Sequence, residues 1–167
     1  MHGDIMKKIV VMSDNHGDIS SLNKIKEIEN NADYYIHCGD SEASSEELHS
    51  FYAVKGNNDW FNPNLRDEIV LNVEGINIYI CHGHKVGYVN RLQNLATIAN
   101  HYHCSLTLFG HSHVPCDEMV DGVRIINPGS TSLPRGGSKP SYAVIEINNG
   151  QISVLLKRFL KDSSDKN

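Results

Sequence analysis

Five short apolar segments of the chain are each followed, within four residues, by side chains that can bind a metal ion. The segments are rich in β-branched residues, which is typical of buried strands. We predict strands at residues 7–12, 34–38, 51–55, 76–81 and 105–109. Ligands of open α/β sheets bind outside the carboxyl ends of the strands, so the residues that follow these strands should converge on one crevice. The candidates are Asp14, His16, Asp40, Asn57, His82, His111 and His113.

The intervening segments complete an α/β pattern. Apolar residues recur at helical spacing over residues 19–29 and 90–102, and Asn90 can cap the second helix. Ser44 and Glu47 form a capping-box pattern, which predicts a short helix there. Helices alternate with strands early in the chain and hairpins dominate late, so we expect mixed sheets in an α/β arrangement. The predicted hairpin turns lie at residues 74–75, 121–122 and 149–150.

The length of 167 residues favours one domain over residues 1–167. Residues 1–5 are expected to be an N-terminal extension before Met6, and residues 160–167 a frayed polar tail. No apolar run approaches the ~18 residues of a membrane span, and no signal peptide is recognisable. We therefore expect a cytoplasmic protein with no membrane partner. The sequence leaves the oligomeric state open.

The charge of the chain limits its partners. A net charge of −5 and no basic run argue against a long nucleic acid, because duplex binding needs several Lys and Arg side chains that neutralise phosphates. Four cysteines occur singly, without a C-x-x-C pair, so they indicate neither a zinc knuckle nor a redox dithiol.

The candidate residues predict a metal site with two ions. Imidazole and carboxylate groups suit divalent Mn, Fe, Co, Ni and Zn. Two carboxylates, four imidazoles and one amide exceed the needs of a single ion, so we expect two divalent ions with one carboxylate bridging them. Such ions usually lie ~3.5 to 4 Å apart.

Most of the motifs are weak evidence alone, since short polar residues after a strand are ordinary turn formers. Gly-His-Ser-His is stronger, because two histidines two residues apart after an apolar strand are seldom needed for packing. The order of the motifs is specific. The series D-x-H, GD, GN-x-D, HGH and GHSH over residues 7–159 resembles the calcineurin-like metallophosphoesterase superfamily. The short length and the Asn127-Pro128-Gly129-Ser130 segment resemble its small bacterial and archaeal phosphodiesterase branch, the YfcE type. The resemblance implies a four-layer αββα sandwich, in which two mixed sheets are flanked by helices.

The resemblance also implies roles for individual residues. Asp40 would bridge the two ions, manganese being the first expectation, and a hydroxide between the ions would attack the phosphorus of a small phosphodiester. The first ion would be held by Asp14, His16 and His113, and the second by Asn57, His82 and His111.

The sequence departs from the family after Asn57. Many relatives carry His there as a proton donor to the leaving group, but this chain has Asn58, and an amide cannot act as a general acid. We expect Asn58 and Arg135 to contact substrate, Asp59 to act by orienting neighbouring groups, and His84 to act near the metals or on the substrate. The histidines without an assigned role are His2, His37, His49, His101 and His103.

Three alternatives remain open from the sequence. A phosphomonoesterase or nucleotidase would use the same metals. A nuclease is disfavoured because the chain lacks a basic groove. A non-catalytic scaffold, like the retromer subunit that shares this fold, is disfavoured because all seven ligand positions are intact.

Overall fold

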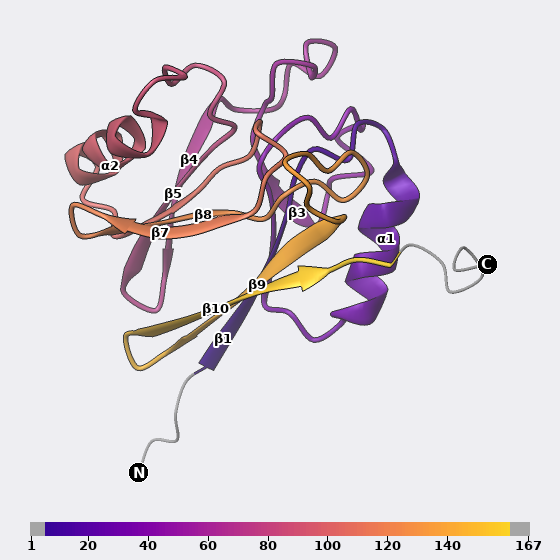
Figure 1. Ribbon diagram of the computed structural model, residues 1–167. Helices are drawn as coiled ribbons and strands as arrows, with labels where there is room; N and C mark the ends of the chain where they lie inside the picture. Colours follow the sequence, from indigo (N-terminus) through magenta and orange to yellow (C-terminus); the bar gives the residue numbers. More distant parts are fainter. Residues whose placement is uncertain (1–5, 161–167) are drawn as a thin grey trace.

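The computed structural model describes residues 6–160, and the expected N-terminal extension and most of the expected tail lie outside them. Two five-stranded sheets pack face to face, and one helix covers the outer face of each (Figure 1). This is the predicted four-layer αββα sandwich. The helices are α1 (Ile19–Ile28) and α2 (Arg91–His101). The strands are β1 (Met6–Met12), β2 (Tyr34–His37), β3 (Phe51–Ala53), β4 (Glu68–Val73), β5 (Ile76–Cys81), β6 (Leu106–Leu108), β7 (Cys116–Val120), β8 (Val123–Asn127), β9 (Ser141–Asn148) and β10 (Gln151–Arg158).

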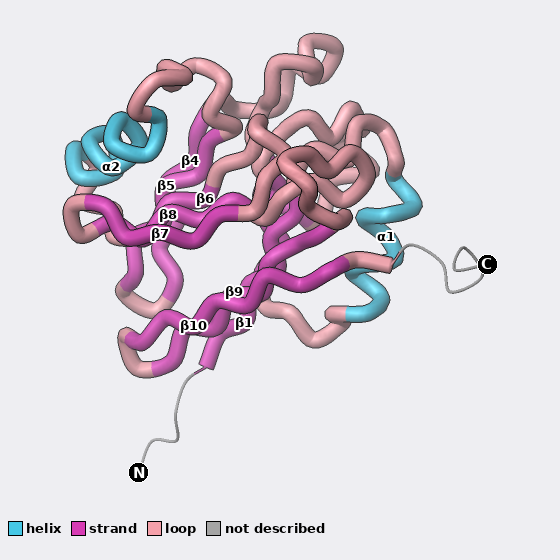
Figure 2. Tube along the Cα trace, viewed as in Figure 1, coloured by secondary structure: helices cyan, strands magenta, loops and turns pink. Residues whose placement is uncertain are grey.

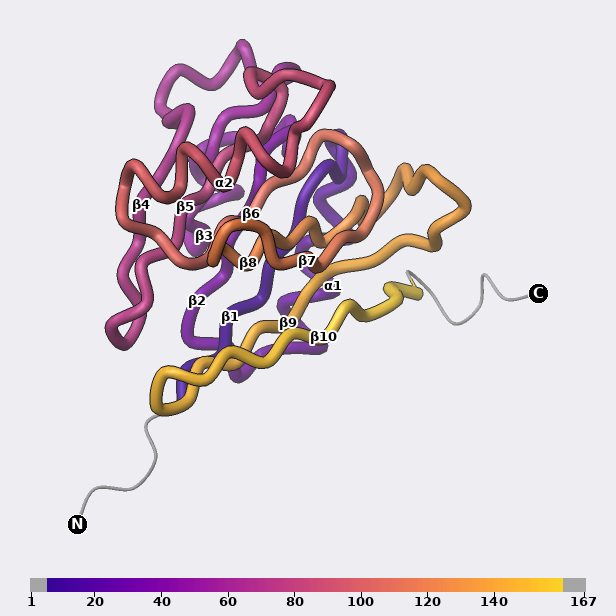
Figure 3. The backbone as a smooth tube through the Cα atoms, turned by 60° about the vertical axis from the view of Figure 1, so that its left-hand side comes forward, coloured from indigo at the N-terminus to yellow at the C-terminus, as the bar shows by residue number. Residues whose placement is uncertain are grey.

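The first sheet has the order β10-β9-β1-β2-β3, and β9 and β10 run alongside β1 in Figure 3. The strands β1, β2 and β3 are parallel, whereas β9 pairs antiparallel with β1 and β10. Alternation along β1 divides its side chains between two layers. Ile9 and Val11 face the core between the sheets, whereas Val10 and Met12 pack in the cluster that includes Leu22 of α1.

The second sheet has the order β4-β5-β6-β8-β7, with parallel pairing from β5 through β6 to β8 and antiparallel strands at both edges. Along β5, Ile78 and Ile80 join the core between the sheets, and Tyr79 and Cys81 join the cluster that includes Leu95 of α2. The two sheets thus share one apolar layer. The loops at the carboxyl ends of the parallel strands gather at one end of the molecule, where Figure 2 shows a concentration of loop segments.

All three predicted hairpins are confirmed, but three local details differ. Residues 45–50 form turns rather than a helix, although Ser44 and Glu47 do exchange the expected capping bonds, at 2.9 and 3.1 Å. The strand β3 begins directly after these turns. Asn90 has a left-handed backbone (φ 58°), so its side chain makes no capping bond to α2. The strands β3 and β6 are shorter than predicted.

Within residues 6–160, neither helix is long and apolar enough to cross a membrane.

A buried carboxylate joins α1 to the first sheet. Glu29, 4% exposed, accepts bonds from Lys8 Nζ (2.8 Å), Lys157 Nζ (2.6 Å) and Tyr142 Oη (2.6 Å). Burial acts to raise the pKa of Glu29, but these three donors outweigh it and lower the pKa to about 2.

We expect Glu29 to make the fold sensitive to acid. In the unfolded chain a glutamate binds a proton near pH ~4.3. The contribution of ionised Glu29 to the free energy of unfolding is therefore complete above that pH, and it is lost as the pH falls towards about 2. The contribution is on the order of 3 kcal/mol at neutral pH. Urea unfolding should show Glu29→Gln to be destabilised at neutral pH and progressively less so in acid. Glu27→Gln, an exposed neighbour, is the control, and equal behaviour of the two variants would refute the assignment.

Candidate metal centre

The loops that carry the candidate ligands are held together by backbone hydrogen bonds. The amide of Asp14 donates to Gly39 O and that of His16 to Asp40 O, each at 3.0 Å. Five of the candidates have left-handed backbones, a conformation that costs a non-glycine residue roughly 1 to 2 kcal/mol. They are Asp14, His16, Asp40, His111 and His113. Such strain persists where the surroundings fix it, and it concentrates at functional sites.

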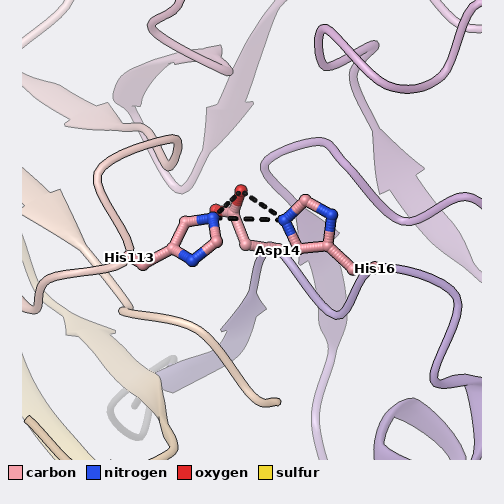
Figure 4. Close-up of side chains that lie close together, drawn as sticks. All are labelled: Asp14, His16 and His113. Atoms are coloured by element: carbon pink, nitrogen blue, oxygen red, sulfur yellow. Dashed lines mark hydrogen bonds and ion pairs between the residues drawn. The ribbon is translucent and has the colours of Figure 1, made fainter. Parts of the chain in front are cut away.

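The first cluster is formed by Asp14, His16 and His113, whose side chains face one another in Figure 4. His113 Nε2 lies 3.3 Å and His16 Nε2 3.8 Å from Asp14 Oδ1, and the two Nε2 atoms are 3.1 Å apart. Asp14 is fully buried. Its Oδ2 accepts bonds from Ser13 Oγ and the His111 amide, but its buried Oδ1 has no hydrogen-bond partner.

The outer hydrogen bonds of these imidazoles determine which nitrogens are free. His16 Nδ1 lies 3.0 Å from Glu42 Oε2, and His113 Nδ1 lies 2.7 Å from Leu133 O. Since both partners are acceptors, each Nδ1 carries the proton and donates it. In neutral imidazoles the Nε2 lone pairs then face each other and Asp14 Oδ1, an arrangement that either a shared proton or a bound cation stabilises.

The second cluster brings Asp40, Asn57 and His82 together. His82 Nδ1 donates to Cys38 O at 2.7 Å, and its Nε2 lies 3.0 Å from Asn57 Oδ1 and 3.3 Å from Asp40 Oδ2. Asp40 Oδ2 is also 3.8 Å from His16 Nε2, so this carboxylate lies between the two clusters. The ring of His111 stands 5.1 Å from that of His82, centroid to centroid.

Electrostatics keep the carboxylates ionised. Burial acts to raise the pKa of Asp40, but hydrogen bonds from His82 and Asn58 outweigh it and lower the pKa. Burial acts to lower the pKa of His82, but the hydrogen bond to Asp40 and the charge of Asp14 outweigh burial and raise the pKa. Without metal, the raised pKa therefore favours a proton on the His82 ring, which would otherwise bind a cation. The donor set of carboxylate, imidazole and amide fits divalent transition metals.

Comparison of the sequence with known protein families shows which family the chain belongs to. Residues 6–150 match the family model of the calcineurin-like phosphoesterase superfamily domain. The chain belongs to this superfamily.

Its relatives include named phosphoesterases. The probable metallophosphoesterase YsnB of Bacillus subtilis is 36% identical over 87% of this chain and 88% of its own. The phosphodiesterase YfcE of Escherichia coli is 25% identical over 90% of this chain and 92% of its own. These names and the shared family identify the chain as a metallophosphoesterase, a class of hydrolase that uses divalent metals.

Solved structures agree with the fold. A predicted phosphoesterase from Streptococcus pneumoniae superposes with a TM-score of 0.85 at 30% identity, covering 92% of this chain and 90% of that one. Vacuolar Protein Sorting 29 from Cryptosporidium parvum superposes with a TM-score of 0.74 at 16% identity, over 93% and 99% of the two chains. The second likeness shows the fold alone.

Asn58 and Asp59, the two residues after Asn57, support the candidate metal centre through hydrogen bonds with Asp40. Asn58 donates to both oxygens of Asp40, from its amide N–H at 2.8 Å and from Nδ2 at 3.0 Å. Asp59 is fully buried and accepts backbone N–H bonds from Asp40, Glu42 and Gly56 at 2.7 to 2.8 Å. Asp59 therefore orients the two ligand loops, and its burial places it out of reach of a substrate.

His84 and Arg135 lie at the rim of the site. The His84 ring stands 5.3 Å from that of His82 and 6.2 Å from that of His111, and its buried Nδ1 has no hydrogen-bond partner. Arg135 is exposed, and its charge opposes protonation of His113.

Sequence reasoning missed two supporting residues. Glu42 fixes the His16 ring, as described above. His37 is fully buried, its Nδ1 accepts the Gly39 amide (3.0 Å), and its Nε2 lies 2.7 Å from Asn15 Oδ1, which joins the loops of both aspartates. Burial lowers the pKa of His37 to about 4, so the ring is neutral and can make both bonds. The only sequence signal was their position beside candidate ligands.

We expect Glu42→Ala to weaken metal binding by about 10- to 100-fold, because the His16 ring loses the acceptor that fixes its orientation. Titration calorimetry with Mn²⁺ measures the change. Glu46→Ala removes an exposed carboxylate from the same loop and should bind metal as the unmodified protein does. Equal affinities for all three proteins would show that Glu42 does not support His16.

Proposed function

We propose that this metallophosphoesterase is a dinuclear enzyme that hydrolyses small phosphodiesters. The observation that carries the proposal is the position of Asp40, whose Oδ2 lies between His82 Nε2 (3.3 Å) and His16 Nε2 (3.8 Å). A carboxylate in that place can serve two cations and offset their mutual repulsion. The relative named YfcE phosphodiesterase supports the choice of diesters.

Asp40 would bridge the two ions, and manganese is the first choice over iron, nickel, cobalt and zinc. The first ion would be held by Asp14, His16 and His113, and the second by Asn57, His82 and His111. Bound divalent ions supply Lewis acidity towards the phosphate and activate water as the nucleophile.

The residues of the chain prepare the site for that chemistry. Asp14 and Asp40 are held as carboxylates and would offset only part of the charge of two divalent cations, so the loaded site is positive within an acidic protein and attracts phosphate. Asn58 fixes Asp40 through two hydrogen bonds. Arg135 is exposed at the rim, where it can reach a bound substrate. The ring of His84, outside the ligand set, stands 5.3 Å from that of His82.

Two other functions remain candidates. A phosphomonoesterase or nucleotidase would use the same residues. A scaffold without catalysis draws on the shared fold of Vacuolar Protein Sorting 29, but it offers no reason for the facing imidazoles of His16 and His113.

We expect Asp40→Asn to bind one ion in place of two, because it removes the charge that lets two cations lie close together. Hydrolysis of a diester should fall by about three orders of magnitude, which corresponds to ~4 kcal/mol of transition-state stabilisation. Metal analysis by mass spectrometry and initial rates are the measurements. Asp33→Asn alters an exposed aspartate and is the control. Two ions and normal turnover in Asp40→Asn would refute the bridging role.

We also expect bis-nitrophenyl phosphate to be hydrolysed faster than nitrophenyl phosphate, since few basic side chains near the site can hold a dianion. EDTA should remove the activity, and added Mn²⁺ should restore it. Initial rates with both esters at equal metal concentration test this. A preference for the monoester would make the protein a phosphatase, and the absence of both metal and turnover would favour the scaffold.

A further inference from the structure

Trp60 is the single tryptophan of the chain, and its side chain is 81% exposed. Tryptophan is large and is highly buried on average in folded proteins, so this exposure is unusual. Phe61 beside it is 46% exposed, and the two rings meet edge to face, with centroids 5.9 Å apart and planes at 88°. Aromatic rings favour this arrangement, in which Phe61 supports the Trp60 ring from one side. The aromatic pair, Trp60 and Phe61, thus presents an apolar surface to solvent.

The backbone on both sides of the aromatic pair is held against the loop that carries Asp40. Asp59 is fully buried and accepts hydrogen bonds from the backbone N–H groups of Asp40 and Glu42, each at 2.8 Å. On the other side, Asn62 is buried and its Nδ2 donates to Ala43 O at 3.2 Å. The Asn62 amide also donates to Asp59 O at 3.0 Å, which closes a turn around the pair. The two rings are therefore exposed on a backbone that is fixed by hydrogen bonds.

These contacts place the aromatic pair beside the metal centre. Asn58 donates to both oxygens of Asp40, at 2.8 and 3.0 Å. Trp60 follows two residues later, so its Cα lies at most ~8 Å from that of Asn58, since consecutive Cα atoms are ~3.8 Å apart. Asn57, a candidate ligand in the same segment, is exposed, so the centre is open to solvent on this side. The segment between β3 and β4 projects from the end of the molecule where the ligand loops gather (Figure 1).

We propose that Trp60, supported by Phe61, stacks on a planar aromatic ester group of the substrate and makes the enzyme selective for phosphodiesters that carry one. An aryl ring and a nucleobase both offer the flat π face that stacks on an aromatic side chain. The inference rests on the proposed function in placing the phosphate of the substrate at the metal ions. It adds a specificity-determining residue that the metal ligands do not imply, because Trp60 follows the GN-x-D motif and is not part of it.

The experiment compares phenylphosphonate with methylphosphonate, which differ in the presence of a ring and cannot be hydrolysed as esters. Calorimetry on the protein loaded with Zn²⁺, a closed-shell ion, should show phenylphosphonate to bind about tenfold more tightly, because stacking contributes to that ligand alone. Since Trp60 is the single tryptophan, its fluorescence reports on this ring directly. Phenylphosphonate should change the emission, and methylphosphonate should not. The 5′-methylenephosphonates of adenosine and of ribose repeat the comparison for a nucleobase.

Three variants assign the effect to the ring. Trp60→Ala should lose about tenfold in affinity for phenylphosphonate and bind methylphosphonate as the unmodified protein does. Trp60→Phe keeps an aromatic ring and should recover part of the loss. Tyr52→Ala removes an exposed aromatic ring from the edge strand β3 and should leave both affinities unchanged. The metal content should be the same in all four proteins.

Equal affinities of the unmodified protein for the two phosphonates, or no binding of either, would overturn the proposal. An equal loss for both ligands in Trp60→Ala, or a loss of the same size in Tyr52→Ala, would also overturn it. A preference for phenylphosphonate alone would identify the group as an aryl ring, and a preference within both pairs would include a nucleobase. Ring-dependent binding through Trp60 in a protein that hydrolyses no diester would instead refute the proposed function, and diester hydrolysis without ring-dependent binding would refute only this inference.

Discussion

The unpartnered Oδ1 of Asp14 is the constraint around which the site is arranged. It is buried, ionised and faced by imidazole nitrogens of His113, His16 and His82 at 3.3 to 3.8 Å. A buried acceptor without a donor costs about 1 to 3 kcal/mol, and more when it is charged. The Nε2 atoms of His16 and His113, which face each other, also need a shared proton or a cation between them. A divalent cation resolves both costs at once, so the stability of this end of the molecule and its chemistry depend on the same atoms.

The site also joins the two sheets. The loops after β1, β2 and β3 supply the aspartates, His16 and Asn57, and the loops after β5 and β6 supply the other histidines. Close approach of these loops requires glycine at several positions, and two of these glycines lie against the carboxylates. A Cβ on Gly110 would lie 2.6 Å from Asp14 Oδ2, and one on Gly56 would lie 2.2 Å from Asp40 Oδ1. The glycines in the GHSH and GN-x-D motifs therefore let backbone pass directly against the two carboxylates.

Much of the fold was predictable because its signals are local. Alternation of apolar residues in β5 and the Asp121-Gly122 turn specify strand and hairpin without reference to the rest of the chain. The position of each ligand at a strand end was predictable for the same reason. The roles of Glu42 and His37 were not, because each depends on a contact with a residue on another loop. Nor was the left-handed backbone of Asn90, since the residue type favours both a cap and that conformation.

The asparagine at position 58, where the sequence resemblance leads us to expect histidine, has a structural explanation in its contacts. Its backbone N–H and Nδ2 hold both oxygens of Asp40, so the residue keeps a role at the site although it cannot transfer a proton. Asp59 accepts a hydrogen bond from the backbone N–H of Asp40. Asp40, the proposed bridging residue, is therefore held through both its side chain and its backbone. The three consecutive residues thus have different roles. Asn57 faces His82, Asn58 holds the side chain of Asp40, and Asp59 joins the loops that follow β2 and β3. A histidine in place of Asn58 would exchange the amide Nδ2 donor to Asp40 Oδ2 for a ring nitrogen, which can carry a transferable proton.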